Sequence, residues 1–216
     1  MNTRIAGQDE ALVLIVDDDE RIREGLAELM ASVGLESACF GSARELLNSA
    51  LPERPGCMVL DVRLPGLSGL DFQHHLASNG NAKPIVFLTG HGDIPMSVQA
   101  MKAGAIDFLT KPVRDQALID AIMTAIDRDI AQREVAANVR KHAARYNTLT
   151  PRERQVLREV ARGRVNKQIA FDLGISEITV KLHRGNLMRK MHAGSVGDIV
   201  RSWEALPASL REKEPT

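Results

Sequence analysis

Two short apolar segments of this chain end abruptly in carboxylates. Residues 12–16 are followed by three aspartates at 17–19, and residues 57–60 are followed by Asp61. Continuous apolar runs of this length are typical of strands that are buried on both faces of a parallel sheet. In open α/β sheets, ligands bind beyond the carboxyl ends of such strands. The two segments therefore predict an acidic site at one edge of a sheet.

The first 128 residues alternate between strand and helix patterns. Apolar runs predict strands at 12–16, 36–40, 57–60, 84–88 and 106–109. Between them, helical patterns lie near 20–33, 42–50, 69–78 and 95–103, and another begins near Asp115. This alternation predicts an α/β fold, a doubly wound parallel sheet with helices on both faces. The last helical pattern continues without Gly or Pro to about Tyr146.

The rest of the chain has helical patterns only. Thr150 to Glu153 combine a capping-box pattern with Pro at the first helical position. Further helices are expected at about 166–173, from the cap Ser176 to Met191, and after Ser195, and the tail from Pro207 is expected to fray. We predict three regions: the α/β domain at 1–128, a helical linker at 129–146, and a small all-α domain of four helices at 147–216.

The formal net charge of zero conceals two halves of opposite sign. Residues 1–128 carry a net charge of −7, and residues 147–216 carry +5. A basic domain joined to an acidic one indicates different partners, and the basic domain is the candidate for nucleic acid. Random surface charge would give the same numbers, so charge alone does not decide between the two.

Several protein classes are disfavoured by what the sequence lacks. No apolar stretch approaches the roughly 18 residues that a membrane span needs, and the polar N-terminus does not resemble a signal peptide. Cys39 and Cys57 have no metal-ligand spacing, and we expect both to be reduced core residues. We therefore expect a cytoplasmic protein with no membrane partner.

The residues at the predicted strand ends suit phosphoryl chemistry. Asp17 and Asp18 could hold Mg²⁺, which prefers oxygen ligands, and Asp61 could attack phosphorus to form an aspartyl phosphate. Lys111 could neutralise phosphate oxygens, and the Thr89 hydroxyl could donate to another. Any one of these residues alone would be an ordinary turn or surface residue, so their joint occurrence carries the interpretation.

Four separated segments of the first domain occur in the order in which one protein family has them. Residues 15–19 (Ile-Val-Asp-Asp-Asp), 60–66 (Leu-Asp-Val-Arg-Leu-Pro-Gly), 88–90 (Leu-Thr-Gly) and 108–112 (Phe-Leu-Thr-Lys-Pro) resemble the receiver domain of two-component response regulators. Residues 89–93 and 100–105 resemble the FixJ subgroup. The resemblance covers the whole first domain and implies a flavodoxin-like (βα)5 fold.

This resemblance also implies roles for individual residues. Asp61 would accept phosphate from a sensor histidine kinase, with Mg²⁺ held by Asp17, Asp18, Asp61 and the backbone carbonyl of Arg63. Thr89 and Phe108 would be the switch residues. A cis peptide bond before Pro112 would aim Lys111 at the site, and His91 would influence the phosphate lifetime.

The third predicted helix of the basic domain has two distinct faces. At about 100° per residue, Val180, Leu187 and Met191 fall together and should face the core. Ile178, Leu182, Gly185 and Arg189 fall on the opposite side. This outer side could enter the major groove of DNA, but the helix alone is explained equally well by a side that faces solvent.

The surrounding segments favour DNA binding. Residues 149–154, 166–170 and 175–183 resemble the LuxR-type helix-turn-helix. The resemblance implies that Lys181, Leu182 and Gly185 occupy base-reading positions, although the usual polar or basic residue is absent at Gly185. The remaining candidates for contact with DNA are Lys167, Thr179 and His183, near phosphates, and Arg164, Arg184 and Arg189.

We interpret the chain as a FixJ/NarL-type response regulator that controls transcription and is not a turnover enzyme. Phosphorylation would promote a homodimer that binds double-stranded DNA, with RNA polymerase as a further candidate partner. Ile94, Val98 and Met101 would form the dimer contact, or would be ordinary core residues.

Two alternatives stay open. One is a phosphate-independent DNA-binding regulator whose receiver is a docking surface. The other is a Mg²⁺-dependent aspartyl-phosphate phosphatase, which would need a carboxylate where the chain has Arg63.

Overall fold

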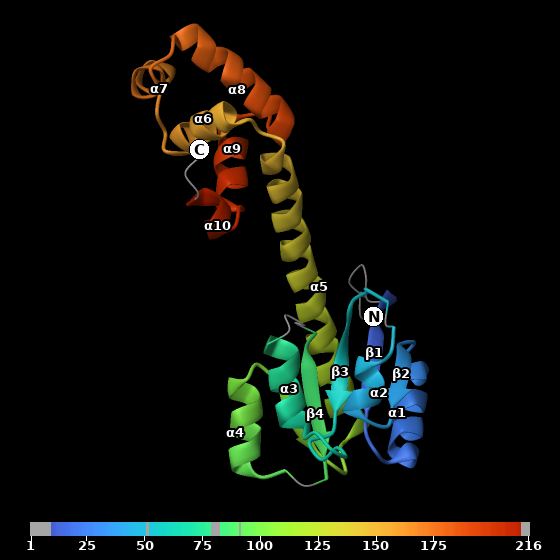
Figure 1. The fold of residues 1–216 in the computed structure, drawn as a ribbon. Coiled ribbons are helices and arrows are strands. Elements are labelled where there is room, and N and C mark those ends of the chain that lie inside the picture. The colour runs from blue at the N-terminus through green and yellow to red at the C-terminus, as the bar shows by residue number, and fades with distance from the viewer. Residues whose placement is uncertain (1–9, 51, 79–82, 91, 213–216) are drawn as a thin grey trace. The chain divides into compact units, whose positions relative to one another are not determined.

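The computed structural model describes residues 10–50, 52–78, 83–90 and 92–212. The chain divides into two compact units, Met1–Arg133 and Glu134–Thr216 (Figure 1). Within the described ranges, none of the helices combines the length and apolar character that crossing a membrane requires.

The first unit is built on a five-stranded parallel sheet. Its strands are β1 (Leu12–Val16), β2 (Glu36–Phe40), β3 (Gly56–Leu60), β4 (Ile85–Thr89) and β5 (Asp107–Thr110). The order β2-β1-β3-β4-β5 confirms the predicted doubly wound, flavodoxin-like topology. β4 begins one residue later than predicted. Pro84 has no N–H to donate and contributes only its carbonyl, which accepts from the Met58 amide at 2.8 Å.

The helices of this unit follow the strands in alternation. They are α1 (Glu20–Ser32), α2 (Ala43–Leu47), α3 (Gly69–Ser78), α4 (Ile94–Lys102) and the first part of α5 (Asp115–Asn147). α2 ends at Leu47, earlier than predicted. The Ser49 hydroxyl donates to the Leu46 carbonyl at 2.7 Å, and such side-chain bonds compete with continuation of a helix.

Alternate residues of the central strands enter two separate cores. Leu14, Leu60 and Phe87 pack with α2, α3 and α4 on one face of the sheet, whereas Ile15 and Val59 pack with α1 and α5 on the other. This arrangement buries β1, β3 and β4 on both faces, as their continuous apolar sequences predict.

The two cysteines differ in their surroundings. Cys57 is buried in β3, as expected. The expectation that Cys39 is a core residue was wrong, because it lies exposed on the edge strand β2. An edge strand has a neighbour on one side only, and its side chains are less completely covered.

The second unit is helical. It contains the last turns of α5, then α6 (Pro151–Ala161), α7 (Asn166–Leu173), α8 (Glu177–Met191), α9 (Val196–Glu204) and α10 (Ala208–Arg211). The frayed tail expected from Pro207 was wrong as far as Glu212, because α10 is ordered. Leu210 packs against the helical core, and its carbonyl accepts a hydrogen bond from the Tyr146 hydroxyl at 3.3 Å.

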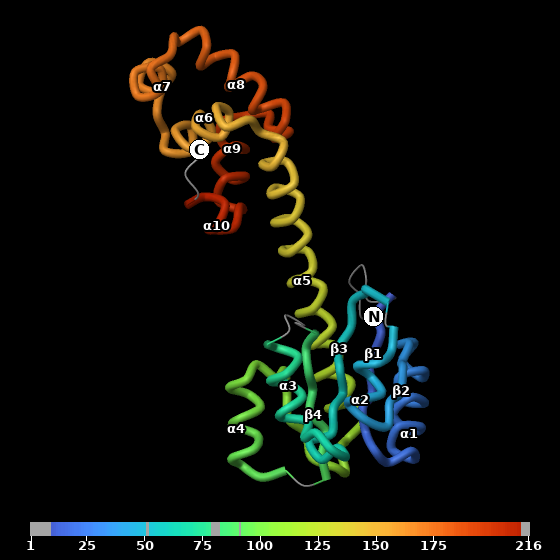
Figure 2. Tube along the Cα trace, viewed as in Figure 1, coloured from blue at the N-terminus to red at the C-terminus, as the bar shows by residue number. Residues whose placement is uncertain are grey.

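Helix α5 is continuous over 33 residues, which confirms the uninterrupted helical pattern that the sequence predicts. Leu118, Ile122 and Ile126 belong to the core of the first unit, and Tyr146 belongs to the core of the second. The Cα trace in Figure 2 follows this helix from one unit into the other. The proposed limits 1–128, 129–146 and 147–216 stay a prediction.

One buried carboxylate stabilises the helical unit. Glu153 is 3% exposed, and its Oε2 accepts from the Thr150 amide at 2.8 Å and from Lys190 Nζ at 2.7 Å. Burial raises the pKa of the Glu153 carboxyl, but the hydrogen bonds from Lys190 and Thr150 outweigh burial and leave it below its ordinary value of 4.5. Glu153 therefore stabilises the fold above pH 4.5, and this contribution is lost as pH falls through the folded-state pKa.

Glu153→Gln is expected to lower the free energy of unfolding by about 1–3 kcal/mol at neutral pH, because a buried charge-assisted pair is lost. The difference from the wild type should shrink as pH falls below 4.5. Urea unfolding followed by fluorescence of Trp203, the chain's one tryptophan, measures both. Glu159→Gln is a matched control, since its pairing with the exposed Arg162 should contribute less than about 1 kcal/mol. A difference that does not change with pH would contradict the prediction.

Candidate functional site

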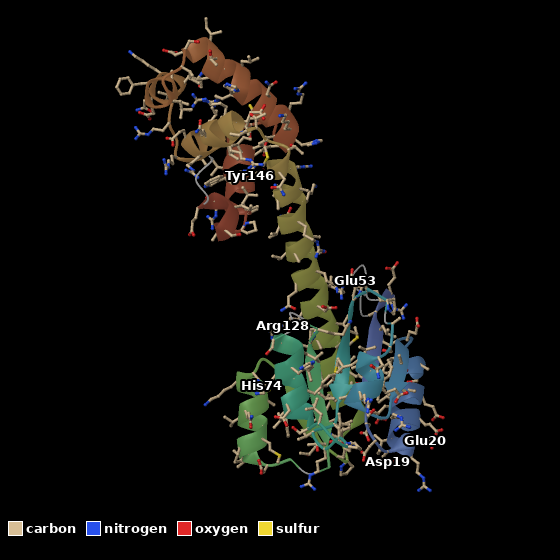
Figure 3. All side chains as sticks on the ribbon, in the orientation of Figure 1. Asp19, Glu20, Glu53, His74, Arg128 and Tyr146 are labelled. Carbon is tan, nitrogen blue, oxygen red and sulfur yellow. The ribbon has the colours of Figure 1, made fainter. Side chains whose placement is uncertain are left out.

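The predicted acidic residues meet at the carboxyl edge of the sheet. β1 and β3 are neighbours with Val16 paired to Leu60, so the residues that follow, Asp17 and Asp61, lie side by side. The Asp61 amide donates to the Val16 carbonyl at 2.9 Å, which fixes this register beyond the last strand residues. Figure 3 marks this edge by Asp19. The sheet topology alone therefore brings together carboxylates that are 44 residues apart in sequence.

Lys111 reaches the same edge from β5. Its amide donates to the Thr89 carbonyl at 2.8 Å, and the peptide bond to Pro112 is cis, as predicted. Its Nζ donates to Asp61 Oδ2 at 2.8 Å and also to Asp17 Oδ2. One ammonium thus bridges the two carboxylates.

Burial makes the charges of this cluster strongly interdependent. Asp17 and Asp61 are only 2% and 7% exposed. Burial raises the pKa of Asp17, helped by the negative charge of Asp61 and opposed by hydrogen bonds from Lys111 and the Asp19 amide. Burial lowers the pKa of Lys111, but its hydrogen bonds to Asp17 and Asp61 outweigh this and raise it overall. The site therefore holds more negative charge than its lysine balances.

Three carboxylates could hold a metal ion here. Asp17, Asp18 and Asp61 each offer one oxygen, and these oxygens lie within 4.8 Å of one another. Asp18 is exposed to solvent, and the other two are buried. An all-oxygen donor set with one open side fits Mg²⁺, which keeps several waters. The Arg63 amide donates to Asp61 Oδ1 at 3.0 Å, whereas the metal role of the Arg63 carbonyl stays a prediction.

The two predicted switch residues lie near each other on the neighbouring strands β4 and β5. Thr89 ends β4 and is fully buried, and the half-buried Phe108 in β5 packs against Phe87 with ring centroids 5.9 Å apart. A Cβ placed on Gly92 would lie 2.6 Å from Phe108 Cε1 and 3.3 Å from Thr89 Cγ2. Gly92 therefore leaves the space that both side chains occupy. His91 lies outside the described residues.

Sequence reasoning missed several supporting residues. The Arg23 guanidinium donates to the Asp17 carbonyl at 2.8 Å, and Asp19 caps α1 by accepting from the Arg21 amide at 2.9 Å. A Cβ on Gly69 would lie 2.3 Å from the Asp61 carbonyl oxygen, so α3 begins in direct contact with the acceptor's backbone. The Arg23 and Gly69 contacts join different elements and have no local signal, whereas the Asp19 cap is local and could be read from an Asp directly before a helical pattern.

The helical unit presents the expected outward face on α8. Val180, Leu187 and Met191 are fully buried, as predicted, and Ile178 and Leu182 are 79% and 62% exposed. Four further candidate residues on α8 have these environments: Lys181, Gly185 and Arg189 are exposed and His183 is half-buried. The half-buried Thr179 lies in the first turn, where its hydroxyl is hydrogen-bonded to Ser176 at 2.8 Å.

A cavity of the helical unit is lined by residues of both α7 and α8. It has a volume of about 530 Å³, and its lining includes Arg164, Lys167 and Arg184. Arg184 Nη1 donates to Asn166 Oδ1 at 2.7 Å, which connects the start of α7 to the middle of α8. The structure thus brings Lys167 together with Arg164 and Arg184, which were predicted as further candidates for contact with DNA. Asn166, which orients one of them, was missed.

Comparison with known proteins assigns both units to families. Residues 13–123 match the response regulator receiver domain, and residues 147–203 match the bacterial regulatory proteins of the luxR family. The two matches cover the same parts of the sequence as the receiver and helix-turn-helix resemblances.

Similar proteins span nearly the whole chain. Nodulation protein W of Bradyrhizobium diazoefficiens is 52% identical over 96% of this chain and 91% of its own length. The transcriptional regulatory protein FixJ of Rhizobium meliloti is 42% identical over 88% and 93%. The solved structure of the response regulator StyR is 46% identical, with a TM-score of 0.82 over 90% of this chain and 98% of that one. The chain therefore belongs to the response regulators of the FixJ type, transcriptional regulators in which a receiver domain precedes a LuxR-type DNA-binding domain.

Proposed function

We propose that Asp61 is the phosphoacceptor of this response regulator and that its phosphorylation controls dimerisation and DNA binding. The observation that carries the proposal is the position of Lys111, whose ammonium contacts both Asp61 and Asp17 at the edge where Asp18 and Thr89 also lie. A sensor histidine kinase is the proposed donor. In the transfer, a carboxylate oxygen of Asp61 bonds to phosphorus as the N–P bond of the donor phosphohistidine breaks and imidazole leaves.

Each neighbouring group has a separate part in this proposal. Lys111 holds a positive charge beside the incoming phosphoryl oxygens and orients the Asp61 carboxylate. Mg²⁺, held by Asp17, Asp18, Asp61 and the Arg63 carbonyl, would supply further positive charge when bound. The Thr89 hydroxyl donates to a phosphoryl oxygen, and Phe108 follows it because the two share the space beside Gly92.

The outer face of α4 is the proposed dimer contact. Ile94, Val98 and Met101 are 78%, 46% and 45% exposed, so they are available for contact with a partner. Grouped exposed apolar side chains favour an interaction surface. Sedimentation of the protein with and without phosphorylation, repeated with operator DNA, tests whether phosphate drives this association.

Ile94→Glu is expected to weaken the phosphorylated dimer by tenfold or more, about the effect of burying an unpaired charge, while leaving phosphorylation unchanged. Sedimentation velocity over a range of protein concentrations measures the dissociation constant. Leu47→Glu, at a 49% exposed leucine on α2, is the matched control and should leave the dimer intact. An unaltered dimer in Ile94→Glu would exclude this face.

The outward face of α8 is proposed to enter the major groove, with Lys181, Leu182 and Gly185 facing the bases. Lys167, Thr179, His183 and Arg189 are proposed to lie near the phosphates. We propose RNA polymerase as the partner through which bound regulator alters transcription. In this scheme the protein is modified once per signal and does not turn over a substrate.

Lys181→Ala is expected to weaken operator binding by roughly ten- to a hundredfold, the range for losing one good base contact. The change would be measured by fluorescence anisotropy at fixed ionic strength with a duplex selected by the wild-type protein. Arg201→Ala removes the same charge from α9, where Arg201 pairs with Asp198, and should have little effect. Equal affinity of Lys181→Ala for selected and random duplexes would identify a specificity role; undiminished specific binding would contradict the assignment.

Two alternatives make different predictions. If the receiver is only a docking surface, Asp61→Asn would leave DNA affinity and transcription unchanged under kinase activation. A phosphatase would hydrolyse a small phosphate ester repeatedly and would need a second carboxylate near Asp61. At the position two residues later, Arg63 is exposed and only its backbone amide contacts Asp61 among its described hydrogen bonds.

A further inference from the structure

The receiver domain contains a cavity away from the acidic edge. Its volume is about 280 Å³, and its walls include Leu76 of α3, Ile85 at the start of β4 and Ile106 just before β5. Since Asp61 and Thr89 lie at the other ends of the strands, this cavity is at the opposite end of the sheet. Figure 3 shows Arg128, one of its lining residues, and Asp19 at opposite ends of the receiver domain.

A buried amide in the cavity lining has an unused acceptor. Gln73 is 4% exposed, and its Nε2 donates to the Ala100 carbonyl at 3.3 Å. Its Oε1 is buried and accepts no hydrogen bond within the described part of the chain. Leaving such an acceptor unpaired costs about 1–3 kcal/mol, and native proteins rarely do so without a reason. The oxygen itself has almost no surface open to the cavity, so a hydrogen-bond donor from a bound molecule would satisfy it once the amide turns toward that space.

The same cavity is lined by two cations. Lys83 and Arg128 contribute to its walls, and no carboxylate does so among the described lining residues. Outside the lining, Asp129 accepts at 2.9 Å from the Gly56 amide and from Arg133 Nε, and it lies 3.9 Å from Lys83 Nζ. Lys83 Nζ also donates to the Arg54 carbonyl at 3.3 Å, and a bound anion would join these partners. Apolar walls with a few convergent polar groups are typical of sites for small organic molecules.

We propose that this cavity binds a small organic carboxylate with an apolar body and a hydrogen-bond donor. The carboxylate contacts Lys83 and Arg128, the apolar body lies against Leu76 and Ile85, and the donor reaches Gln73 Oε1. The site is separate from the phosphoacceptor, and its existence does not depend on the role of Asp61.

The probe is 4-hydroxybenzoate, titrated into the full-length chain and followed by methyl NMR. The expected result is saturable shifts of the Leu76, Ile85 and Ile106 methyl groups. Benzoate, which lacks the donor, and phenol, which lacks the carboxylate, should bind on the order of tenfold more weakly. A panel of hydroxy- and amino-substituted carboxylates that gives no saturable shift at millimolar concentration would overturn the proposal.

Variants locate the binding. Arg128→Met changes an exposed side chain and should weaken 4-hydroxybenzoate binding about tenfold, while Gln73→Leu should abolish the preference over benzoate. Lys102→Met, at an exposed lysine on α4 outside the lining, should bind as the wild type does. Thermal unfolding and phosphorylation by acetyl phosphate check that each variant is folded. Unchanged binding in both Arg128→Met and Lys83→Met would place the ligand elsewhere and refute the site.

Discussion

Asp61→Asn is expected to reduce phosphate incorporation from acetyl phosphate below detection. The variant keeps the shape of the side chain and its contact with the Arg63 amide but replaces one carboxylate oxygen with an amide nitrogen that cannot act as the nucleophile. The loss should be complete, because the proposed nucleophile is also a proposed metal ligand and the hydrogen-bond partner of Lys111. Phosphate-affinity electrophoresis and intact-protein mass spectrometry measure the incorporation directly.

Asp120→Asn is the matched control for this experiment. Asp120 is an exposed residue of α5 whose carboxylate accepts from Gln116, so removing its charge should leave labelling unchanged. Labelling of Asp61→Asn at the wild-type rate would mean that another residue accepts the phosphoryl group. Asp61→Asn also tests the docking-surface alternative, because that alternative predicts that the variant binds DNA as the wild type does.

Gly56→Ala is expected to destabilise the receiver domain by more than about 4 kcal/mol, at the severe end for single substitutions. A Cβ at this position would lie 1.9 Å from the Leu12 carbonyl oxygen, and Leu12 is the paired residue on β1. Neither backbone can withdraw without breaking the central strand pair. The φ of +157° lies at the margin of the region that side chains rarely adopt and adds to the strain. Calorimetry of the full chain measures the loss.

Gly25→Ala provides the control for the added methyl group. Gly25 is exposed in α1, and its added Cβ would meet nothing within 4 Å among the described atoms. Alanine is the better helix former, so this variant should be about 0.5–1 kcal/mol more stable. The unfolding transition reported by Trp203, which lies in the helical unit, should be retained in both variants. A Gly56→Ala receiver with wild-type stability would contradict the close approach of β1 and β3.

The parts of the fold that sequence predicted best are those with local causes. β1 and β3 have continuous apolar sequences because both of their faces are buried, and their limits were predicted to within one residue. The predictions were wrong where the environment of a residue depends on an element that is distant in the sequence. The edge position of β2 exposes Cys39, and packing against Tyr146 orders a tail whose own composition suggested fraying.

The acidic site also has features that the sequence predicts and features that depend on tertiary packing. The meeting of Asp17, Asp61 and Lys111 could be predicted because parallel strands deliver their last residues to one edge. The contacts of Arg23 and the packing of Gly92 depend on side-chain placement across different elements, and no spacing in the sequence encodes it. The unpaired oxygen of Gln73 is a property of the packed structure, since an isolated Gln in a helical pattern reads as a surface residue.

The order in α10 has a practical consequence for dissecting this protein by truncation. The Tyr146 ring, at the end of α5, lies 4.9 Å beneath the Arg154 guanidinium, and its hydroxyl is tied to the Leu210 carbonyl. Cutting the chain at Pro207 would remove that carbonyl and uncover a ring that is 5% exposed. Loss of DNA binding in such a deletion would report damage to the domain's packing, so residues up to Glu212 belong in any fragment used to assign function.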